Sequence, residues 1–138
     1  PHDCTGCFLQ RSTKPLFVHT DWINNQDVED YCEPYCAVLF PLRFDGPCAT
    51  VVFPETSKKP TMDANAHKKN YQYSTQEQKM LGHIKIEDLD RLSKPKRIKW
   101  NVGDVIVWRR EHLHCADNFP AHGTTFKDSL VLFTTKAR

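Results

Sequence analysis

The sequence predicts a mainly β domain, and three observations indicate it. Its apolar runs are short and bounded by turn-forming residues, a pattern that suits strands better than helices. Gly103-Asp104 is typical of a turn, since glycine adopts positive φ and aspartate bonds its own backbone. The 138 residues, 39% of them hydrophobic, are enough for one domain with its own core.

The N-terminal part is expected to hold three strands after an irregular polar start over residues 1–14. The predicted strands are 14–19, 36–44 and 49–54, with a loop or short helix over 23–34. Pro41 cannot donate to a ladder and therefore indicates an edge strand or a bulge. The turn residues Asp45-Gly46-Pro47 suggest that the second and third strands form a hairpin.

Residues 54–95 are expected to form an insertion, made of an exposed loop and two short helices. Hydrophobic residues almost vanish over 55–73, where lysines accumulate. Ser74 followed by Glu77 is a capping-box pattern and predicts the start of the first helix. The second helix is predicted over 86–92, with Ile86, Leu89 and Leu92 facing inward.

The C-terminal part carries the strongest strand signal. Strands are predicted at 97–100 and 105–108, followed by a histidine-bearing strand within 109–119 and a return strand over 126–134. Trp108, on the second of these, and Trp22 are candidates for the wall of a pocket. A histidine and a lysine on the two last strands can face one pocket.

Charge and composition exclude several classes of function. Nineteen basic and seventeen acidic residues give a net charge of +2, which does not indicate the strongly basic surface of a nucleic-acid-binding protein. No apolar run approaches the ~18 residues of a membrane span, and a secretory signal peptide is not expected. The six cysteines are expected to be reduced, as in a cytoplasmic protein.

The cysteines also leave a second interpretation open. Cys4 and Cys7, together with Cys32 and Cys36, could supply four thiolates to a zinc ion. The chain would then be a zinc-stabilised interaction module. The spacing of the second pair and the lack of a glycine-rich knuckle argue against this site.

A metal centre of another kind is predicted from two histidines and a carboxylate. His19 and Asp21 stand at i and i+2 of a predicted strand, so their side chains project from one face. His114 supplies a distant third donor, although His112 offers an equally good pattern. Two imidazoles and one carboxylate suit non-haem Fe(II) and leave coordination positions open.

Two residues of the return strand extend this site. Lys127 provides a positive charge where a carboxylate of a cosubstrate could end, and Ser129 lies on the same face two residues later. Asn118 is a further candidate, as a hydrogen-bond donor near the metal or cosubstrate.

In this order and spacing the motifs resemble the Fe(II)/2-oxoglutarate-dependent oxygenases, which share a double-stranded β-helix (jelly-roll, cupin-like) fold. His19-Thr20-Asp21 is similar to the family's His-x-Asp motif, Gly103-Asp104 to its turn and His114 to its distal histidine. Lys127-Asp128-Ser129 is similar to the basic-x-Ser element that holds the far carboxylate of 2-oxoglutarate.

The resemblance covers about residues 15–135 and implies that 1–138 form a single oxygenase-like domain. Residues 113–119 resemble phytanoyl-dioxygenase-like and small phage or marine bacterial members. Many relatives use arginine where Lys127 stands. Relatives also carry helices and a strand before the His-x-Asp motif, so the chain is either a fragment or a minimal barrel without these N-terminal elements.

The resemblance implies a dioxygenase that hydroxylates a small-molecule substrate, with Fe(II) and 2-oxoglutarate as cofactors. A carboxylate at Asp21, where related halogenases carry a small residue, implies hydroxylation or a similar oxidation. The identity of the substrate and the oligomeric state are not readable from the sequence. A cupin-like barrel that binds a metal or ligand without oxidation is the main alternative, since a fold does not determine a function.

Overall fold

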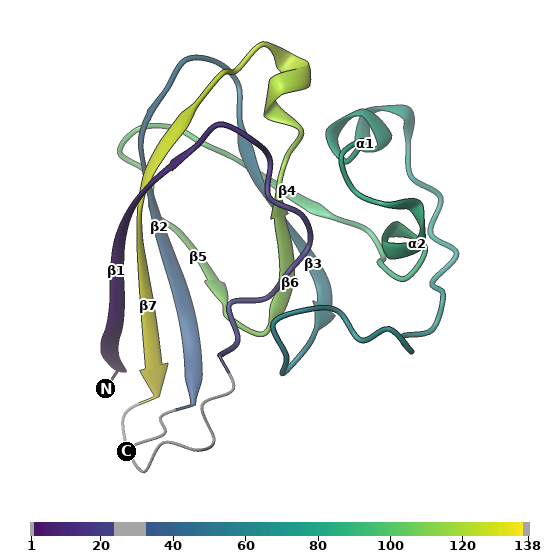
Figure 1. The fold of residues 1–138 in the computed structure, drawn as a ribbon, viewed down its shortest axis with the longest axis horizontal. Coiled ribbons are helices and arrows are strands. Elements are labelled where there is room, and N and C mark those ends of the chain that lie inside the picture. Colours follow the sequence, from purple (N-terminus) through teal and green to yellow (C-terminus); the bar gives the residue numbers. More distant parts are fainter. Residues whose placement is uncertain (1, 24–32, 137–138) are drawn as a thin grey trace.

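The protein folds into two antiparallel β-sheets that face each other, with two short helices outside the smaller sheet (Figure 1). This computed structural model describes residues 2–23 and 33–136. The mainly β class predicted from the sequence is confirmed.

The larger sheet has four strands in the order β1-β7-β2-β5. Their bounds are β1 (His2–Ser12), β7 (Lys127–Lys136), β2 (Pro34–Phe44) and β5 (Ile106–Arg109). The smaller sheet has the order β4-β3-β6, formed by β4 (Lys96–Lys99), β3 (Ala49–Thr56) and β6 (His112–Ala116).

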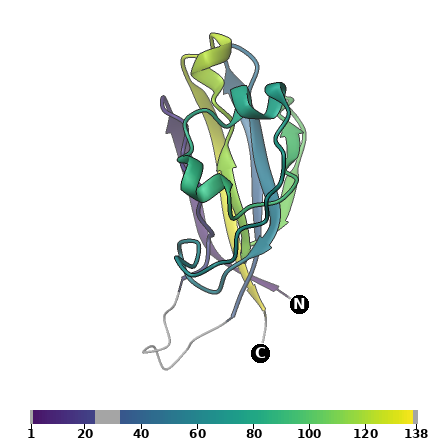
Figure 2. The same ribbon diagram turned by 90° about the vertical axis from the view of Figure 1, so that its right-hand side faces the viewer.

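The smaller sheet separates two hydrophobic clusters, because alternate residues of its strands face opposite sides. On β6, Leu113 and Cys115 pack with the cluster that includes the helical segment, whereas Ala116 packs with the cluster between the sheets. Figure 2, which looks onto the helices, shows them lying across this sheet. His114 therefore faces the space between the two sheets.

The helices are α1 (Thr75–Met80) and α2 (Ile86–Leu89), and a 3-10 helix, η1 (Phe119–His122), precedes β7. The capping box at Ser74 and Glu77 is present as predicted. The expectation for Ile86 is wrong, because its side chain is 74% exposed. Leu92 is fully buried and Leu89 packs against the same core cluster, as predicted, and the buried Leu81 and Ile84 anchor the segment before the helix.

The N-terminal prediction is shifted along the chain. Residues 2–12, expected to be irregular, form β1, while the predicted strand at 14–19 contributes a single bridge at His19. Strand β1 lies at the edge of its sheet and pairs with β7 alone. An edge strand leaves much of its surface in water, so no apolar alternation marks it in the sequence.

The predicted hairpin is wrong, because β2 and β3 belong to different sheets. The turn between them is anchored across the molecule: the carboxylate of Asp45 accepts hydrogen bonds from the backbone and hydroxyl of Thr125. Gly46 is packed so closely that an added Cβ would lie 2.6 Å from the hydroxyl of Thr124. The register between β2 and β7 shifts between Pro41 and Arg43, which fits the predicted alternative of a bulge, whereas β2 is not an edge strand.

No helix in the described part of the chain has both the length and the apolar character needed to cross a membrane.

The turn predicted at Gly103 is present, with φ +93° at this glycine.

Candidate metal centre

Three potential metal ligands, His19, Asp21 and His114, lie together, with one donor atom of each within 4.8 Å of the others. They come from two parts of the chain that backbone hydrogen bonds hold side by side. The amides of His19 and His114 each donate to the other's carbonyl, at 3.0 and 2.9 Å. Beyond this bridge, the amide of Asp21 donates to the carbonyl of Arg110 at 3.1 Å. The predicted strand at 14–19 was expected to present His19 and Asp21 to one site, and the bridge at His19 does so in its place.

Both imidazole rings are oriented by their own neighbours. Nδ1 of His19 donates to the carbonyl of Phe17 at 2.8 Å, and Nδ1 of His114 donates to the carbonyl of His112 at 3.0 Å. A carbonyl only accepts, so each Nδ1 carries a proton, and in a neutral imidazole Nε2 then keeps the lone pair that can bind a metal. These Nε2 atoms lie 3.8 and 3.3 Å from the carboxylate of Asp21.

Burial keeps His114 in the form that binds a metal. The residue is 4% exposed, and its desolvation lowers the pKa to about 4, against the opposing effect of the Asp21 carboxylate. His114 is therefore neutral at pH 7, with the lone pair of Nε2 available to a cation.

Trp108 orients the carboxylate. Its indole Nε1 donates to Oδ2 of Asp21 at 3.2 Å, and its ring lies 5.0 Å from that of His114. The bond restrains one oxygen of Asp21 and leaves Oδ1 facing His19. Of the two tryptophans proposed for the wall of the pocket, Trp108 lines the cavity and Trp22 does not.

The structure distinguishes His114 from His112, which were equally good candidate ligands in the sequence. Nδ1 of His112 donates to the carbonyl of Phe53 at 3.0 Å, and its side chain lines a different cavity. His112 is not part of the metal-ligand group.

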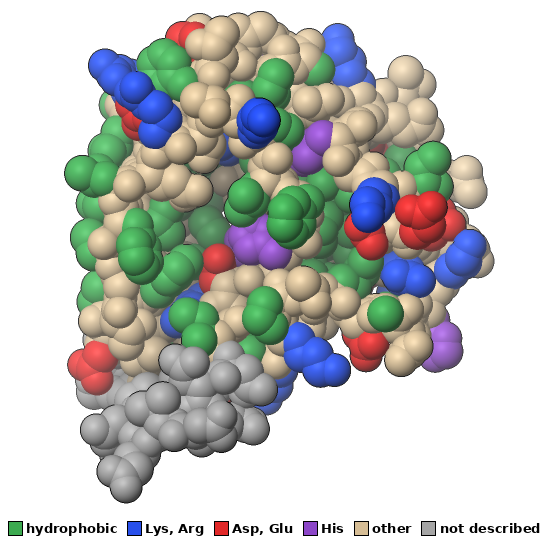
Figure 3. All heavy atoms as spheres, viewed as in Figure 1, with side chains coloured by type: hydrophobic (Ala, Val, Ile, Leu, Met, Phe, Trp, Pro, Cys, Tyr) green, Lys and Arg blue, Asp and Glu red, His purple; other side chains and the backbone are tan. Residues whose placement is uncertain are grey.

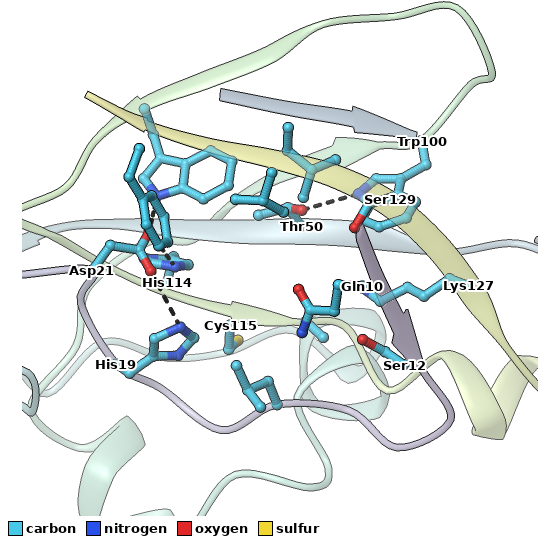
Figure 4. Close-up of a pocket in the computed structure, with 16 residues that line it drawn as sticks. Gln10, Ser12, His19, Asp21, Thr50, Trp100, His114, Cys115, Lys127 and Ser129 are labelled. Carbon is cyan, nitrogen blue, oxygen red and sulfur yellow. Dashed lines mark hydrogen bonds and ion pairs between the residues drawn. The ribbon is translucent and has the colours of Figure 1, made fainter. Parts of the chain in front are cut away.

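The three donors stand at one end of a cavity of about 100 Å³ between the sheets. Figure 3 shows histidine and acidic side chains beside a hollow in this face, bordered by hydrophobic side chains. Figure 4 shows Lys127 and Ser129 at the opposite end, near Gln10 and Ser12 of β1. Gln10 and Ser12 were not predicted to line this cavity, because residues 1–14 were expected to be irregular.

Lys127 is a buried cation, 5% exposed. Its ammonium lies 4.3 Å from the centre of the Trp100 ring and 5.1 Å from that of Phe119. Desolvation lowers its pKa, partly offset by the charge of Asp117. Within the described part of the chain no carboxylate lies at salt-bridge distance from this ammonium. Ser129, on the same side of β7, is 4% exposed.

Asn118, predicted as a donor near the metal or cosubstrate, does not line the cavity. β6 ends at Ala116, and the chain then turns into η1, with Asn118 as its N-cap. Its backbone amide donates to the carbonyl of Met80, and its side chain lies beside Gly82. The turn carries Asn118 out of the sheet before it can reach the cavity.

The three described candidates for a four-thiolate site, Cys4, Cys7 and Cys36, do not lie together. Cys4 and Cys7 are exposed on β1, whereas Cys36 lies on β2, and β7 runs between these two strands. Cys32, the fourth candidate, lies outside the described residues. Over residues 2–23 and 33–136, the His-Asp-His group is the only set of three or more such side chains with metal-binding spacing.

No protein-family model matches the chain, and neither the curated proteins nor the solved structures contain a significant match. Three protein ligands on one side of an ion leave positions for exchangeable ligands, as in catalytic rather than structural metal sites.

The first prediction concerns the identity of the ligands. His114→Ala should weaken Mn²⁺ binding at least about 100-fold, since even residues that only support ligands are worth 10–100-fold. The matched variant His112→Ala should change it by less than about threefold, because His112 faces another cavity. Electron paramagnetic resonance of free Mn²⁺ measures both, and the reverse ranking would contradict the assignment.

The second prediction concerns Trp108. Trp108→Phe keeps an aromatic ring but removes the donor to Asp21, and should weaken Mn²⁺ binding roughly 10–100-fold. Trp100→Phe is the control, because that indole donates to the hydroxyl of Thr50 instead. Equal Mn²⁺ affinities in the two variants would show that the bond to Asp21 does not orient the ligand.

Proposed function

We propose that the protein is an Fe(II)- and 2-oxoglutarate-dependent dioxygenase that hydroxylates a small molecule. The observation that carries the proposal is the pairing of two groups in one cavity: a His-Asp-His set at one end and a buried lysine at the other. A metal site alone would not need the lysine. A dicarboxylic cosubstrate that reaches from a metal to a cation needs both.

The donor set fits ferrous iron. Two neutral imidazoles and one carboxylate are the ligands of the facial triad, and His19, Asp21 and His114 would hold the ion through Nε2, a carboxylate oxygen and Nε2. When bound, iron would supply the redox chemistry that activates oxygen and decarboxylates 2-oxoglutarate. The carbonyls of Phe17 and His112 and the indole of Trp108 keep these ligands oriented.

The far carboxylate of 2-oxoglutarate would bind Lys127 and Ser129. A cation held over two aromatic rings, out of water, attracts an anion more strongly than one at the surface does. Lysine offers a point charge in place of the planar fork of arginine, so other donors must fix the orientation of the carboxylate. The hydroxyl of Ser129 is one such donor.

The fold is proposed to be a double-stranded β-helix, or jelly roll. Two facing antiparallel sheets with the site between them support this assignment. The small cavity favours a small substrate over a macromolecule. A cytoplasmic setting is supported by five described cysteines, all of which are free thiols.

The third prediction tests the reaction class. Under argon, Fe(II) and 2-oxoglutarate together should give a weak visible absorption band that neither gives alone, and admission of oxygen should then produce succinate. His114→Ala should give neither band nor succinate. Metal binding without the band and without succinate would contradict the proposal and favour a cupin-like barrel that binds metal without oxidation.

The fourth prediction concerns Lys127. Lys127→Ala should leave Mn²⁺ affinity nearly unchanged, because an ammonium does not ligate a metal. It should raise the Kd for 2-oxoglutarate by roughly two to three and a half powers of ten, from about 3–5 kcal/mol for a buried charge that loses its partner. Titration calorimetry into Mn²⁺-loaded protein under argon measures the change.

Two further variants complete this experiment. Lys127→Arg should recover part of the affinity, since the positive charge is restored. Lys99→Ala, which removes an exposed lysine of β4, should have no effect on Kd. An unchanged Kd in Lys127→Ala would remove Lys127 from the site and the best reason for naming this cosubstrate.

A further inference from the structure

We infer that β1 forms part of the cosubstrate site, with Gln10 and Ser12 donating hydrogen bonds to the carboxylate that Lys127 attracts. The inference rests on the proposed function and adds two specificity-determining residues to it. It starts from the pairing of β1 with β7, the strand that carries Lys127 and Ser129.

The register of the two strands places the four side chains in two facing pairs. Gln10 lies opposite Ser129, and Ser12 lies opposite Lys127. Directly opposed residues of an antiparallel pair have Cβ atoms roughly 4.5–5.5 Å apart, so these side chains share one patch. All four line the cavity, and Figure 4 shows them at the end away from the histidines.

A pair on the outer face fixes this register. Arg11 and Asp128 lie between the two inner pairs and form a two-pronged contact, with both nitrogen–oxygen distances at 2.7 Å. Arg43 of β2 approaches the same carboxylate at 3.2 Å. A slip of one residue would turn Gln10 and Ser12 outward and also break this contact, so the observed pairing is well specified.

Gln10 and Ser12 have hydrogen-bonding capacity to spare. Neither side chain has a hydrogen-bond partner within the described part of the chain. A carboxylate offers about four acceptor sites on its two oxygens, more than Lys127 and Ser129 would fill from one side. The amide of Gln10 and the hydroxyl of Ser12 supply donors from the neighbouring strand.

The burial of the four residues indicates how they share the task. Lys127 and Ser129 are buried, Ser12 is half-buried and Gln10 is exposed. Solvent exposure therefore increases across the patch, from the buried ammonium of Lys127 to the exposed amide of Gln10. Strand β1 lies on the side of the patch that is open to solvent. A bound carboxylate would sit against β7 and be covered by β1.

Single substitutions give the first part of the test. Gln10→Ala and Ser12→Ala should each raise the Kd of Mn²⁺-loaded protein for 2-oxoglutarate about tenfold, as expected for a hydrogen bond to a charged group. Mn²⁺ affinity should not change. Leu9→Ala is the matched control, because Leu9 is 79% exposed on the outer face of the same strand and should leave Kd unchanged.

Relocating the charge gives the second part. Because Ser12 lies opposite Lys127, the double variant Lys127→Ala/Ser12→Lys should bind 2-oxoglutarate at least about tenfold more tightly than Lys127→Ala. The double variant Lys127→Ala/Leu9→Lys places its charge on the outer face and should recover nothing. Thermal unfolding of each variant shows whether it is folded.

The outcomes separate this inference from the function on which it rests. If wild-type protein with Mn²⁺ does not bind 2-oxoglutarate, both are overturned. If wild type binds and Lys127→Ala weakens binding, but the Gln10 and Ser12 substitutions have no effect and the relocated charge rescues nothing, only the role of β1 is overturned.

Discussion

The backbone bridge between His19 and His114 is the constraint on which the site depends. Two hydrogen bonds join an irregular segment to the middle of β6, and they bring three potential donor atoms within 4.8 Å of one another. Without the bridge, the smaller sheet would present only one of the two histidines, His114, to the cavity. The bridge adds the other two ligands, while the carbonyls on either side fix both rings.

Strand β6 lies between two hydrophobic clusters, and this position directs His114 toward the space between the sheets. Alternate residues of the strand pack toward the helices, and His114 between them faces the larger sheet, where β7 presents Lys127. His114 and Lys127 thus come from opposite sheets and stand at opposite ends of one cavity. The distance between the ends is set by how the two sheets pack.

The sequence predicted those parts of the fold that local chemistry determines. The strands near residues 36–44 and 49–54 and the capping box at Ser74 have local signatures, and they were found. Strand β1 and the change of sheet after β2 depend on partners far along the chain, such as Asp45 with Thr125, and no local pattern shows them. The three proposed ligand residues could be named from their order and type, whereas the proposed role of Gln10 and Ser12 required the register of β1 on β7.

The bridge has a consequence for stability. Its two segments are far apart in the sequence, so an ion held by His19, Asp21 and His114 would act as a crosslink that closes a long loop of chain. Binding to the folded state alone adds to the free energy of unfolding, by an amount that grows with the concentration of free ion. The segment that carries His19 has little regular structure of its own, and the ion would bind it to the sheet as well as serve the chemistry.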